Sequence, residues 1–572
     1  MNIVGLFCTG PNPAACLVKE GELIAFCEEE RFVRVKTANG YSPVRSLSFC
    51  LKKGNISLRK VDHIVIGWDS KKYPHYMREF NIRAFPPRLK RDFTMELLHA
   101  ILYDKDVVID TLRFALRGQG IFDPLPPVHF VEHHRAHAAS TFYPSGFDKA
   151  LILTIDASGE ENATVIWEGN ADTIKPLAEI NLPNSLGWFY SGMTEFLGFS
   201  AYTGEGKLMG LAAYGRPNPR YREKLSNILK VENGLYQLDP TFIYFGEHGH
   251  RSHFTNKMTD LLNMSPRIPE SLVTKEYEDL AFETQFLLEE AVISLVKKFI
   301  SETGLTKVCL AGGVALNCKM NGAILQKAGI EDLFVFPVPY DAGTAFGSAL
   351  LLSKELGYSP RGTRFKHAYW GPDYTNPEIE AVLNELKIPY QKEDDIAGVA
   401  AVALENGQFV GWFQGRGEIG ARALGTRSIL ANPSLPDTKD RINREVKHRE
   451  GFRPFAPSII KEYHNEYLEN PKESDFMLLA FKVKMEKKSS IVATVHVDNT
   501  VRPQTVSSET NELYYNVIKN FRDRTGIAAI LNTSFNVRGE PIVNSPLDAI
   551  RCFHGTGLDV LIIGNYIVRK KK

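Results

Sequence analysis

Two histidines at helical spacing are the first residues in this sequence that could carry chemistry. They are His133 and His137, within the run EHHRAH at 132–137. Residues four apart share one face of a helix, so both imidazoles could bind the same metal ion. The run is not the HExxH motif of zinc proteases, because that motif has Glu directly after the first histidine. The alternative is a histidine-rich helix end that makes ordinary hydrogen bonds.

Two aspartates follow predicted strands and extend this set. Asp156 comes directly after the apolar strand 151–155, and Asp341 precedes a predicted helix that ends near 356. The carboxyl ends of strands in α/β sheets line ligand crevices. Two imidazoles and two carboxylates form a mixed N/O set that suits Fe(II), Mn(II) or Zn(II). The alternative for each aspartate is a helix cap.

Glycine-rich segments predict close approach of the backbone to a ligand. Two of them, TGEGKLMG at 203–210 and AGGVALN at 311–317, lack the Walker A pattern. The second follows a predicted strand and opens a helix, where backbone N–H groups can hold phosphate. A third, GRGEIGAR at 415–422, matches GxGxxG. We reject a dinucleotide site there, because no N-terminal βαβ unit contains it and no later strand ends in an acid.

Basic residues recur in the loops of the last third of the chain. Arginine offers a planar fork to phosphate oxygens and lysine a point charge. Each charge-assisted bond is worth about 1.5–3 kcal/mol, so several could hold a multiply anionic ligand. The alternative is a solvated basic face. These residues are Arg422, Lys447, Arg449, Arg453 and Arg502, together with a polar loop at 532–539.

The elements that must position these residues alternate between strands and helices. Strands at 1–6, 14–18 and 22–28 surround a polar loop, and a similar strand–loop–strand pattern returns at 151–167, which predicts two related lobes. Farther on, strands and helices alternate from 307 to 356, which is typical of parallel pairing in an α/β sheet.

A domain boundary is predicted at 357–375, where glycine, proline and aromatic residues show no helical or strand period. Strands at 408–413, 527–531 and 560–563 then predict a second α/β domain.

Composition excludes several classes of protein. The 572 residues are too many for one ordinary core, so at least two domains are expected. Lys+Arg 68 against Asp+Glu 67 gives a net charge of +1, which argues against nucleic acid and anionic membrane as partners. Neither a secretory signal nor a membrane-spanning run is visible. The seven cysteines are scattered and never form CxxC, which favours reduced thiols and a cytoplasmic location.

Ten strings in one order along the chain resemble the O-carbamoyltransferase family. This family includes the nodulation-factor and antibiotic carbamoyltransferases, and the aminoglycoside type is the most similar in length and layout. The strings are CEEERFVRVK, HHRAHAAS, IDASGEE, GEGKLMGLAAYG, AGGVALNCKMNG, YDAGTAFGSAL, GRGEIGARALGTRSIL, INREVKHREGFRPFAPS, VRPQTV and LNTSFNVRGEPIV.

The resemblance implies an α/β fold with an actin-like (ASKHA), two-lobed N-terminal domain at 1–360 and a YrdC-like domain at 372–572. It implies an ATP-dependent reaction in two halves. The C-terminal domain makes carbamoyl-adenylate from carbamoyl phosphate and Mg-ATP. The N-terminal domain then transfers the carbamoyl group to a hydroxyl of a small-molecule acceptor, such as a sugar, an antibiotic or a toxin-like natural product. A homodimer is the oligomeric state that the resemblance implies.

The resemblance also implies roles for individual residues. The metal, with Fe(II) expected, would be bound by His133, His137, Asp156 and Asp341. Carbamoyl-adenylate would be bound by Lys36, Lys207, Gly312, Gly313 and Asn317. ATP and carbamoyl phosphate would be bound by Arg422, Lys447, Arg453, Arg502, Asn532 and Ser534.

One stretch departs from the family pattern. A loop with histidine and aspartate usually follows the first strand, and here it reads Pro11-Asn12-Pro13, so no general base is assigned. Residues 73–93 are interpreted as a surface insertion, with a role in acceptor choice as the alternative. Two other functions stay open: an actin-fold small-molecule kinase, and a tRNA-modification or nucleotide-switched binding protein.

Overall fold

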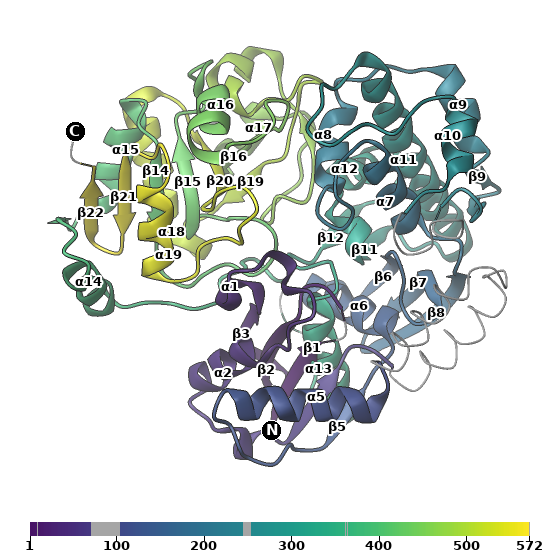
Figure 1. Cartoon of the computed structure of the whole chain (residues 1–572), viewed down its shortest axis with the longest axis horizontal. Coiled ribbons are helices and arrows are strands. Elements are labelled where there is room, and N and C mark those ends of the chain that lie inside the picture. Colours follow the sequence, from purple (N-terminus) through teal and green to yellow (C-terminus); the bar gives the residue numbers. More distant parts are fainter. Residues whose placement is uncertain (9, 70–102, 244–252, 361, 363, 571–572) are drawn as a thin grey trace. The chain divides into compact units, whose positions relative to one another are not determined.

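The computed structural model describes residues 1–8, 10–69, 103–243, 253–360, 362 and 364–570. The chain divides into two compact units, which are described separately (Figure 1). The first unit comprises Met1–Ala25 and Asn39–Phe365, and the second comprises Phe26–Ala38 and Lys366–Lys572. The expected domains, 1–360 and 372–572, differ from these units mainly because residues 26–38 pack with the second unit. The predicted insertion at 73–93 lies outside the described residues.

The first sheet of the first unit has the strand order β3-β2-β1-β4-β5. Strand β1 pairs antiparallel with β2 and parallel with β4, and β4 pairs parallel with β5. The strands are β1 (Asn2–Phe7), β2 (Ala14–Lys19), β3 (Glu22–Glu28), β4 (His63–Ile66) and β5 (Val128–Phe130).

The second sheet repeats this topology, with the order β8-β7-β6-β11-β12. Strand β6 pairs antiparallel with β7 and parallel with β11, and β11 pairs parallel with β12. The strands are β6 (Lys149–Ile155), β7 (Asn162–Asn170), β8 (Thr173–Asn181), β11 (Lys307–Ala311) and β12 (Asp332–Val335). The repeated hairpin predicted from the sequence is therefore part of a repeated five-stranded sheet.

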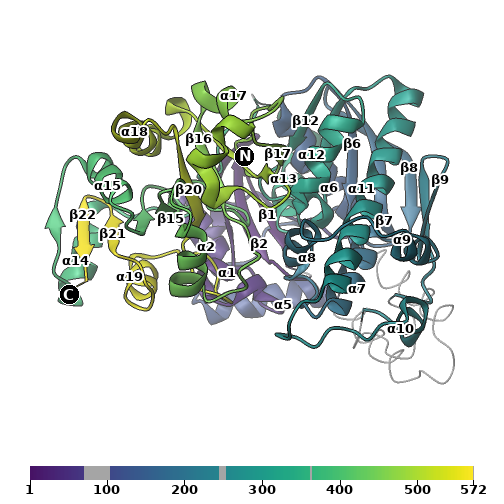
Figure 2. The same ribbon diagram turned by 90° about the horizontal axis from the view of Figure 1, so that it is seen from above.

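Helices pack on and around these sheets, and the 29-residue helix α11 lies beside α8, α9 and α12 (Figure 2). Among the described helices, none is long and apolar enough to cross a bilayer. The helices are α2 (Val44–Lys53), α5 (Lys105–Gly118), α6 (His133–Phe142), α7 (Leu186–Phe196), α8 (Glu205–Ala212), α9 (Pro219–Ser226), α10 (Asn256–Leu262), α11 (Lys275–Thr303), α12 (Cys318–Lys327) and α13 (Gly343–Glu355). A short hairpin joins β9 (Leu229–Glu232) to β10 (Leu235–Leu238).

Glycines let α13 approach the first sheet and α6 at backbone distance. An added Cβ at Gly5 on β1 would lie 1.9 Å from the Ala345 carbonyl oxygen. An added Cβ at Gly347 would lie 1.8 Å from the Ala136 carbonyl oxygen on α6. Real side chains never approach a backbone this closely, so both contacts require glycine. Helix α13 is thereby fixed between β1 and α6.

The second unit is built on a mixed sheet of eight strands, in the order β13-β22-β21-β14-β15-β20-β16-β19. The strands are β13 (Gln391–Lys392), β14 (Val410–Phe413), β15 (Arg427–Ala431), β16 (Ala456–Ile460), β19 (Gln504–Val506), β20 (Ala529–Ser534), β21 (Val560–Ile563) and β22 (Tyr566–Arg569). A separate pair joins β17 (Phe481–Lys482) to β18 (Thr500–Val501). The α/β class predicted from the alternation of elements is confirmed.

Apolar residues cover both faces of this sheet. On β14, Val410 and Trp412 join one buried cluster and Phe413 joins the other. Because successive side chains on a strand point to opposite faces, β14 is buried on both sides. The helices of this unit are α1 (Glu30–Val33), α14 (Asn376–Glu385), α15 (Ile396–Glu405), α16 (Thr438–Arg441), α17 (His464–Tyr467), α18 (Ser508–Thr525) and α19 (Pro546–His554).

The contact between α6 and α13 predicts a large effect of substitution at Gly347. In Gly347→Val the new side chain would collide with the α6 backbone, so we expect the free energy of unfolding to fall by about 1–3 kcal/mol or more. Chemical denaturation measures this change. Gly118→Val is the control, since nothing lies within 4 Å of its added Cβ. Equal stability of the two variants would contradict the close packing.

Candidate functional site

Helix α6 carries two of the predicted metal ligands, and packing of α13 sets its position. The α6 backbone around Ala136 lies directly against Gly347. Asp341 immediately precedes α13, so the same contact brings His133 and His137 beside the turn that holds this aspartate.

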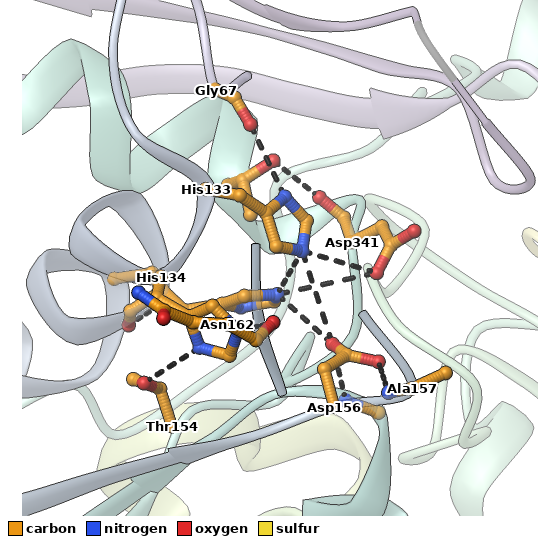
Figure 3. Close-up of polar contacts among 12 residues, drawn as sticks. Gly67, His133, His134, Thr154, Asp156, Ala157, Asn162 and Asp341 are labelled. Carbon is orange, nitrogen blue, oxygen red and sulfur yellow. Dashed lines mark hydrogen bonds and ion pairs between the residues drawn. The ribbon is translucent and has the colours of Figure 1, made fainter. Parts of the chain in front are cut away.

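The four predicted ligands converge on one point (Figure 3). One ligand atom from each of His133, His137, Asp156 and Asp341 lies within 4.8 Å of the other three. The two Nε2 atoms are 3.1 Å apart, and His137 Nε2 is 3.2 Å from Asp156 Oδ2. His133 Nε2 is 3.7 Å from Asp341 Oδ1. Ligands held about 2.1 Å from one ion lie about 3 Å apart in cis positions and about 4.2 Å apart in trans positions. These spacings fit a single ion.

Backbone groups orient the ligands toward that point. His133 Nδ1 lies 3.2 Å from the Gly67 carbonyl oxygen, which can only accept, so Nε2 of the neutral ring keeps its lone pair. The Asp156 carboxylate accepts from Ala157 N at 2.7 Å and from Gly313 N at 2.9 Å. Backbone contacts of these kinds orient the histidine and carboxylate ligands of known metal sites.

The charges of these buried groups are poorly balanced by the protein alone. Burial lowers the pKa of His133, but Asp156 and Asp341 outweigh it and raise the value to about 9. Burial and the charge of Asp156 raise the pKa of Asp341 to about 7. Burial and the charge of His133 lower the pKa of His137 to about 4. His133 and Asp341 thus hold protons that a bound cation would displace. Two imidazoles and two carboxylates form a donor set that fits a divalent cation.

Glu160 supports the site, although the sequence analysis did not single it out. Its carboxylate accepts from His133 N at 2.9 Å and from Asp69 N at 2.6 Å. It therefore fixes the start of α6, where backbone N–H groups have no partner within the helix. Glu160 stands in the string IDASGEE, so its proximity to Asp156 in the sequence was the available signal.

His134 points away from the ligand cluster. Its Nε2 lies 2.9 Å from the Asn162 carbonyl oxygen and its Nδ1 lies 2.9 Å from Thr154 Oγ1. Burial and the charge of His133 lower its pKa to about 3, so the ring is neutral and its role is structural.

The glycine-rich loop after β11 lies against the metal ligands. Gly312 has φ +88, and its added Cβ would lie 2.2 Å from the Ile155 carbonyl oxygen. Gly313 donates to Asp156, as described above. Asn317 instead makes a reciprocal amide pair with Gln285, at 2.9 and 3.1 Å. Of these three residues predicted to contact carbamoyl-adenylate, Gly312 and Gly313 lie at the metal-ligand cluster. Asn317 belongs to a buried hydrogen-bond network.

Lys207 lies on α8, with its ammonium 5.4 Å from the centre of the Phe199 ring.

The loop after β1, which departs from the family pattern, approaches Asp341. An added Cβ at Gly10 would lie 3.8 Å from Asp341 Oδ2. Residues 11–13 of this loop offer neither an imidazole nor a carboxylate next to that aspartate.

In the second unit, Lys447 is a buried cation that is 3% exposed. Its ammonium donates to the Ser534 carbonyl oxygen and to Asn536 Oδ1 and O, the latter two at 2.8 and 2.9 Å. All of these acceptors are neutral. Burial, with the charges of Arg449, Arg453 and Lys36, holds the pKa of Lys447 well below its usual range. The site therefore favours an anion that would stabilise the charged lysine.

Further cations surround Lys447 and depress one another's pKa. Burial and the charge of Arg453 lower the pKa of Arg449 well below its usual range, and Arg502 adds to this. Burial, Arg538 and Arg502 lower the pKa of Arg453, while Glu450 opposes them. We call Lys36, Lys447, Arg449, Arg453, Arg502 and Arg538 the cation cluster. Of these, Arg449, Arg538 and Lys36 were absent from the predicted ATP and carbamoyl-phosphate ligands, and Lys36 was instead predicted to bind carbamoyl-adenylate.

Lys36 belongs to this cluster through the segment Phe26–Ala38. The resemblance grouped it with carbamoyl-adenylate ligands of the N-terminal domain. Its charge instead acts on Lys447 in the second unit.

Asn532 and Arg422 are linked through a loop backbone. The buried Asn532 amide donates to the Ala423 carbonyl oxygen at 3.2 Å, next to Arg422, and to Ser458 Oγ and Gln504 Oε1. Asn532 thus ties the loop between β14 and β15 to β20. Ser534 Oγ donates to Asn536 Oδ1 at 2.7 Å, so it supports the acceptor of Lys447.

The GxGxxG match in this loop has a structural explanation. The Glu418 carboxylate accepts from the amides of Leu424, Thr426 and Arg427, at 2.8, 3.1 and 3.1 Å. The Arg427 guanidinium is buried and donates to backbone carbonyl oxygens, including that of Gln414 at 2.7 Å. The loop is folded around an internal carboxylate.

Comparison with known proteins identifies the family. The family described as Carbamoyltransferase N-terminus matches residues 3–350, and Carbamoyltransferase C-terminus matches residues 401–570. The chain belongs to the carbamoyltransferase family. It is therefore an enzyme that transfers carbamoyl groups, as the resemblance predicted.

Several named relatives of this carbamoyltransferase are bacterial. Nodulation protein NolNO of Sinorhizobium fredii is 38% identical over 98% of this chain and 79% of its own length. Nodulation protein NolO of Bradyrhizobium diazoefficiens is 41% identical over 77% of this chain and 79% of its own. The 3'-hydroxymethylcephem-O-carbamoyltransferase of Amycolatopsis lactamdurans is 31% identical over 45% of this chain and 47% of its own. Among solved structures, HypF of T. kodakarensis matches 63% of this chain and 48% of its own, with 16% identity and a TM-score of 0.32.

The four-residue cluster predicts a loss of metal when one imidazole is removed. We expect His137→Ala of this carbamoyltransferase to retain little of the ion that copurifies with the wild type, because the remaining donors cannot enclose it. Elemental analysis by mass spectrometry measures iron, manganese and zinc per chain. His554→Ala, on the exposed end of α19, is the control. Equal metal content in the two variants would contradict the assignment.

The raised pKa values predict that metal binding is linked to pH. Both Asp341, at about 7, and His133, at about 9, carry protons near neutrality and must lose them to an ion. Affinity should therefore fall as pH falls from 8 to 6, by about tenfold to a hundredfold per pH unit. Calorimetric titration of Mn²⁺ in buffers of different ionisation enthalpy measures the released protons. Binding without proton release would show that these groups are not ligands.

Proposed function

We propose that this carbamoyltransferase is an ATP-dependent O-carbamoyltransferase that works in two half-reactions. The second unit, proposed to be YrdC-like, makes carbamoyl-adenylate. The first unit, proposed to be actin-like, transfers the carbamoyl group to a hydroxyl of a small-molecule acceptor. The relative that acts on a hydroxymethylcephem, by its name, supports an alcohol as acceptor.

The cation cluster is the observation that carries the first half-reaction. Buried cations that depress one another's pKa are costly unless an anion joins them. Carbamoyl phosphate and ATP bring several negative charges between them. Arginine forks suit their phosphate oxygens, and fixed cations stabilise the charge that develops on the leaving group. Two substrates with several negative charges would therefore supply the anionic partner that Lys447 and its neighbouring arginines lack.

The atoms of this step balance with one water molecule. Water cleaves carbamoyl phosphate to carbamate and phosphate. A carbamate oxygen then attacks the α-phosphorus of ATP, the α–β bridging bond breaks, and pyrophosphate leaves. Lys447, Arg453 and Arg422 would hold the phosphate groups and exclude bulk water, which limits loss of the short-lived carbamate.

The second half-reaction is assigned to the four-ligand cluster of the first unit. The acceptor hydroxyl releases its proton to solvent, its oxygen attacks the carbamoyl carbon, the bond from that carbon to the AMP oxygen breaks, and AMP leaves. His133, His137, Asp156 and Asp341 would hold the ion, with Fe(II) proposed and Mn(II) or Zn(II) as alternatives. Such an ion would polarise the carbamoyl oxygen and lower the pKa of the acceptor hydroxyl. Gly312 and Gly313 would let the nucleotide approach the ligands through their backbone.

This division of labour predicts opposite effects in the two units. Lys447→Ala and Arg422→Ala should lower carbamoyl-phosphate-dependent pyrophosphate release by about 10²–10³-fold, because each removes a fixed phosphate contact. His137→Ala should retain pyrophosphate release and lose transfer. A coupled pyrophosphate assay, with AMP measured by chromatography, separates these steps.

Lys519→Ala, an exposed lysine on α18 that is 46% accessible, is the matched control. Loss of pyrophosphate release in His137→Ala would contradict the proposed separation. Absence of pyrophosphate from the wild type with Mg-ATP and carbamoyl phosphate would refute the proposed first half-reaction.

A further inference from the structure

Residues 26–38 reach the second unit from the N-terminal part of the sequence. They continue from β3 and include the short helix α1. The Phe26 amide donates to the Trp370 carbonyl oxygen at 3.2 Å. The string CEEERFVRVK, residues 27–36, lies entirely within this stretch.

Two side chains of this segment hold the loop between β14 and β15. Arg31 Nη2 donates to the Gly420 carbonyl oxygen at 2.6 Å, and Glu28 Oε1 accepts from Gly420 N at 3.2 Å. Both backbone groups of Gly420, whose φ of +91 favours glycine, are thus bound by residues about 390 positions earlier. Arg422, a proposed phosphate ligand, is two positions farther along this loop.

Arg34 holds a different loop, the one between β20 and α19. Its guanidinium donates to the carbonyl oxygens of Ile542 and Pro541 at 2.6 and 2.9 Å. Its Nε lies 3.5 Å from Asp548 Oδ1 on α19. The same loop contains Asn536, which accepts from Lys447. Arg34 itself has φ +60, a left-handed conformation that non-glycine residues adopt at a cost.

The segment therefore touches the loop that carries Arg422 and the loop that carries Asn536 and Arg538, and Lys36 adds a charge that acts on Lys447. Loops of this kind lose affinity when their spacing fluctuates, because binding must then order them. A guanidinium fork that donates to two carbonyl groups fixes a loop more tightly than a single ammonium can.

We propose that residues 26–38 brace the phosphate-binding loops of the second unit, with Arg31 and Arg34 as positioning residues for the first half-reaction. This inference rests on the proposed function for the identity of the substrates, ATP and carbamoyl phosphate. The bracing itself should affect the binding of any polyphosphate by the cation cluster. The C-terminal half of the sequence is then an incomplete site without this N-terminal segment.

The test compares Arg34→Gln, Arg34→Lys and Arg31→Gln in the full chain. We expect both glutamine variants to raise the KM for carbamoyl phosphate about tenfold or more, with a smaller change in kcat. Arg34→Lys should raise the KM less than Arg34→Gln does, since lysine keeps the positive charge and can still donate to one of the two carbonyl groups. Affinity for inorganic tripolyphosphate, measured by calorimetry, should fall in parallel. Arg524→Gln, which breaks an exposed ion pair with Glu405, is the control and should match the wild type.

The outcomes separate this inference from the proposed function. Wild-type KM and tripolyphosphate affinity in Arg34→Gln and Arg31→Gln would overturn the brace. The brace would also be overturned if Arg34→Lys and Arg34→Gln lowered the melting temperature of the ligand-free protein equally and this destabilisation accounted for the whole loss of affinity. The role of Arg34 would then be purely structural. If the wild type forms no pyrophosphate but binds tripolyphosphate, and Arg34→Gln and Arg31→Gln weaken that binding, the proposed function fails and the brace stands.

Discussion

Buried charge that the protein does not balance by itself is the constraint on which both candidate sites depend. In the second unit, Lys447, Arg449 and Arg453 lie close enough to depress one another's pKa. In the first unit, two carboxylates and two imidazoles meet within 4.8 Å. Burying charges is costly in a low-dielectric interior, so a partner of opposite charge would stabilise each cluster. We propose an anionic ligand for the cluster of the second unit and a metal cation for the cluster of the first unit.

The surrounding fold is arranged to keep these groups together. In the first unit, glycines on α13 and β1 permit backbone contacts that place α6 beside Asp341, while Glu160 holds the start of α6. In the second unit, the loop between β14 and β15, which carries the proposed phosphate ligand Arg422, is folded around the Glu418 carboxylate, and Asn532 ties that loop to β20. Rigid support of this kind is what lets like charges stay close until a ligand arrives.

The sequence predicted the elements better than the long-range contacts. The repeated strand–loop–strand pattern at 1–28 and 151–167 followed from strand patterning, and the i,i+4 histidines followed from helix geometry. The positions of Asp156 and Asp341 at strand ends suggested that they share a crevice with those histidines, and the family resemblance implied the same four ligands. Lys36 shows the limit most clearly. Lys36 acts on Lys447, which lies some 400 positions later in the sequence, because the segment 26–38 packs with the second unit. Local sequence patterns carry no signal of such a contact. Glu160 and Arg34 act through backbone contacts, which residue type alone does not reveal.

Formation of carbamoyl-adenylate with pyrophosphate still bound is the central claim of this account. Positional isotope exchange tests it directly, with ATP that carries heavy oxygen in the α–β bridge. The account predicts that the label moves into the nonbridging β positions only when carbamoyl phosphate is present, because bound pyrophosphate rotates before ATP re-forms. Label that stays in the bridge while ATP is converted to ADP would contradict it and would point to phosphoryl transfer instead.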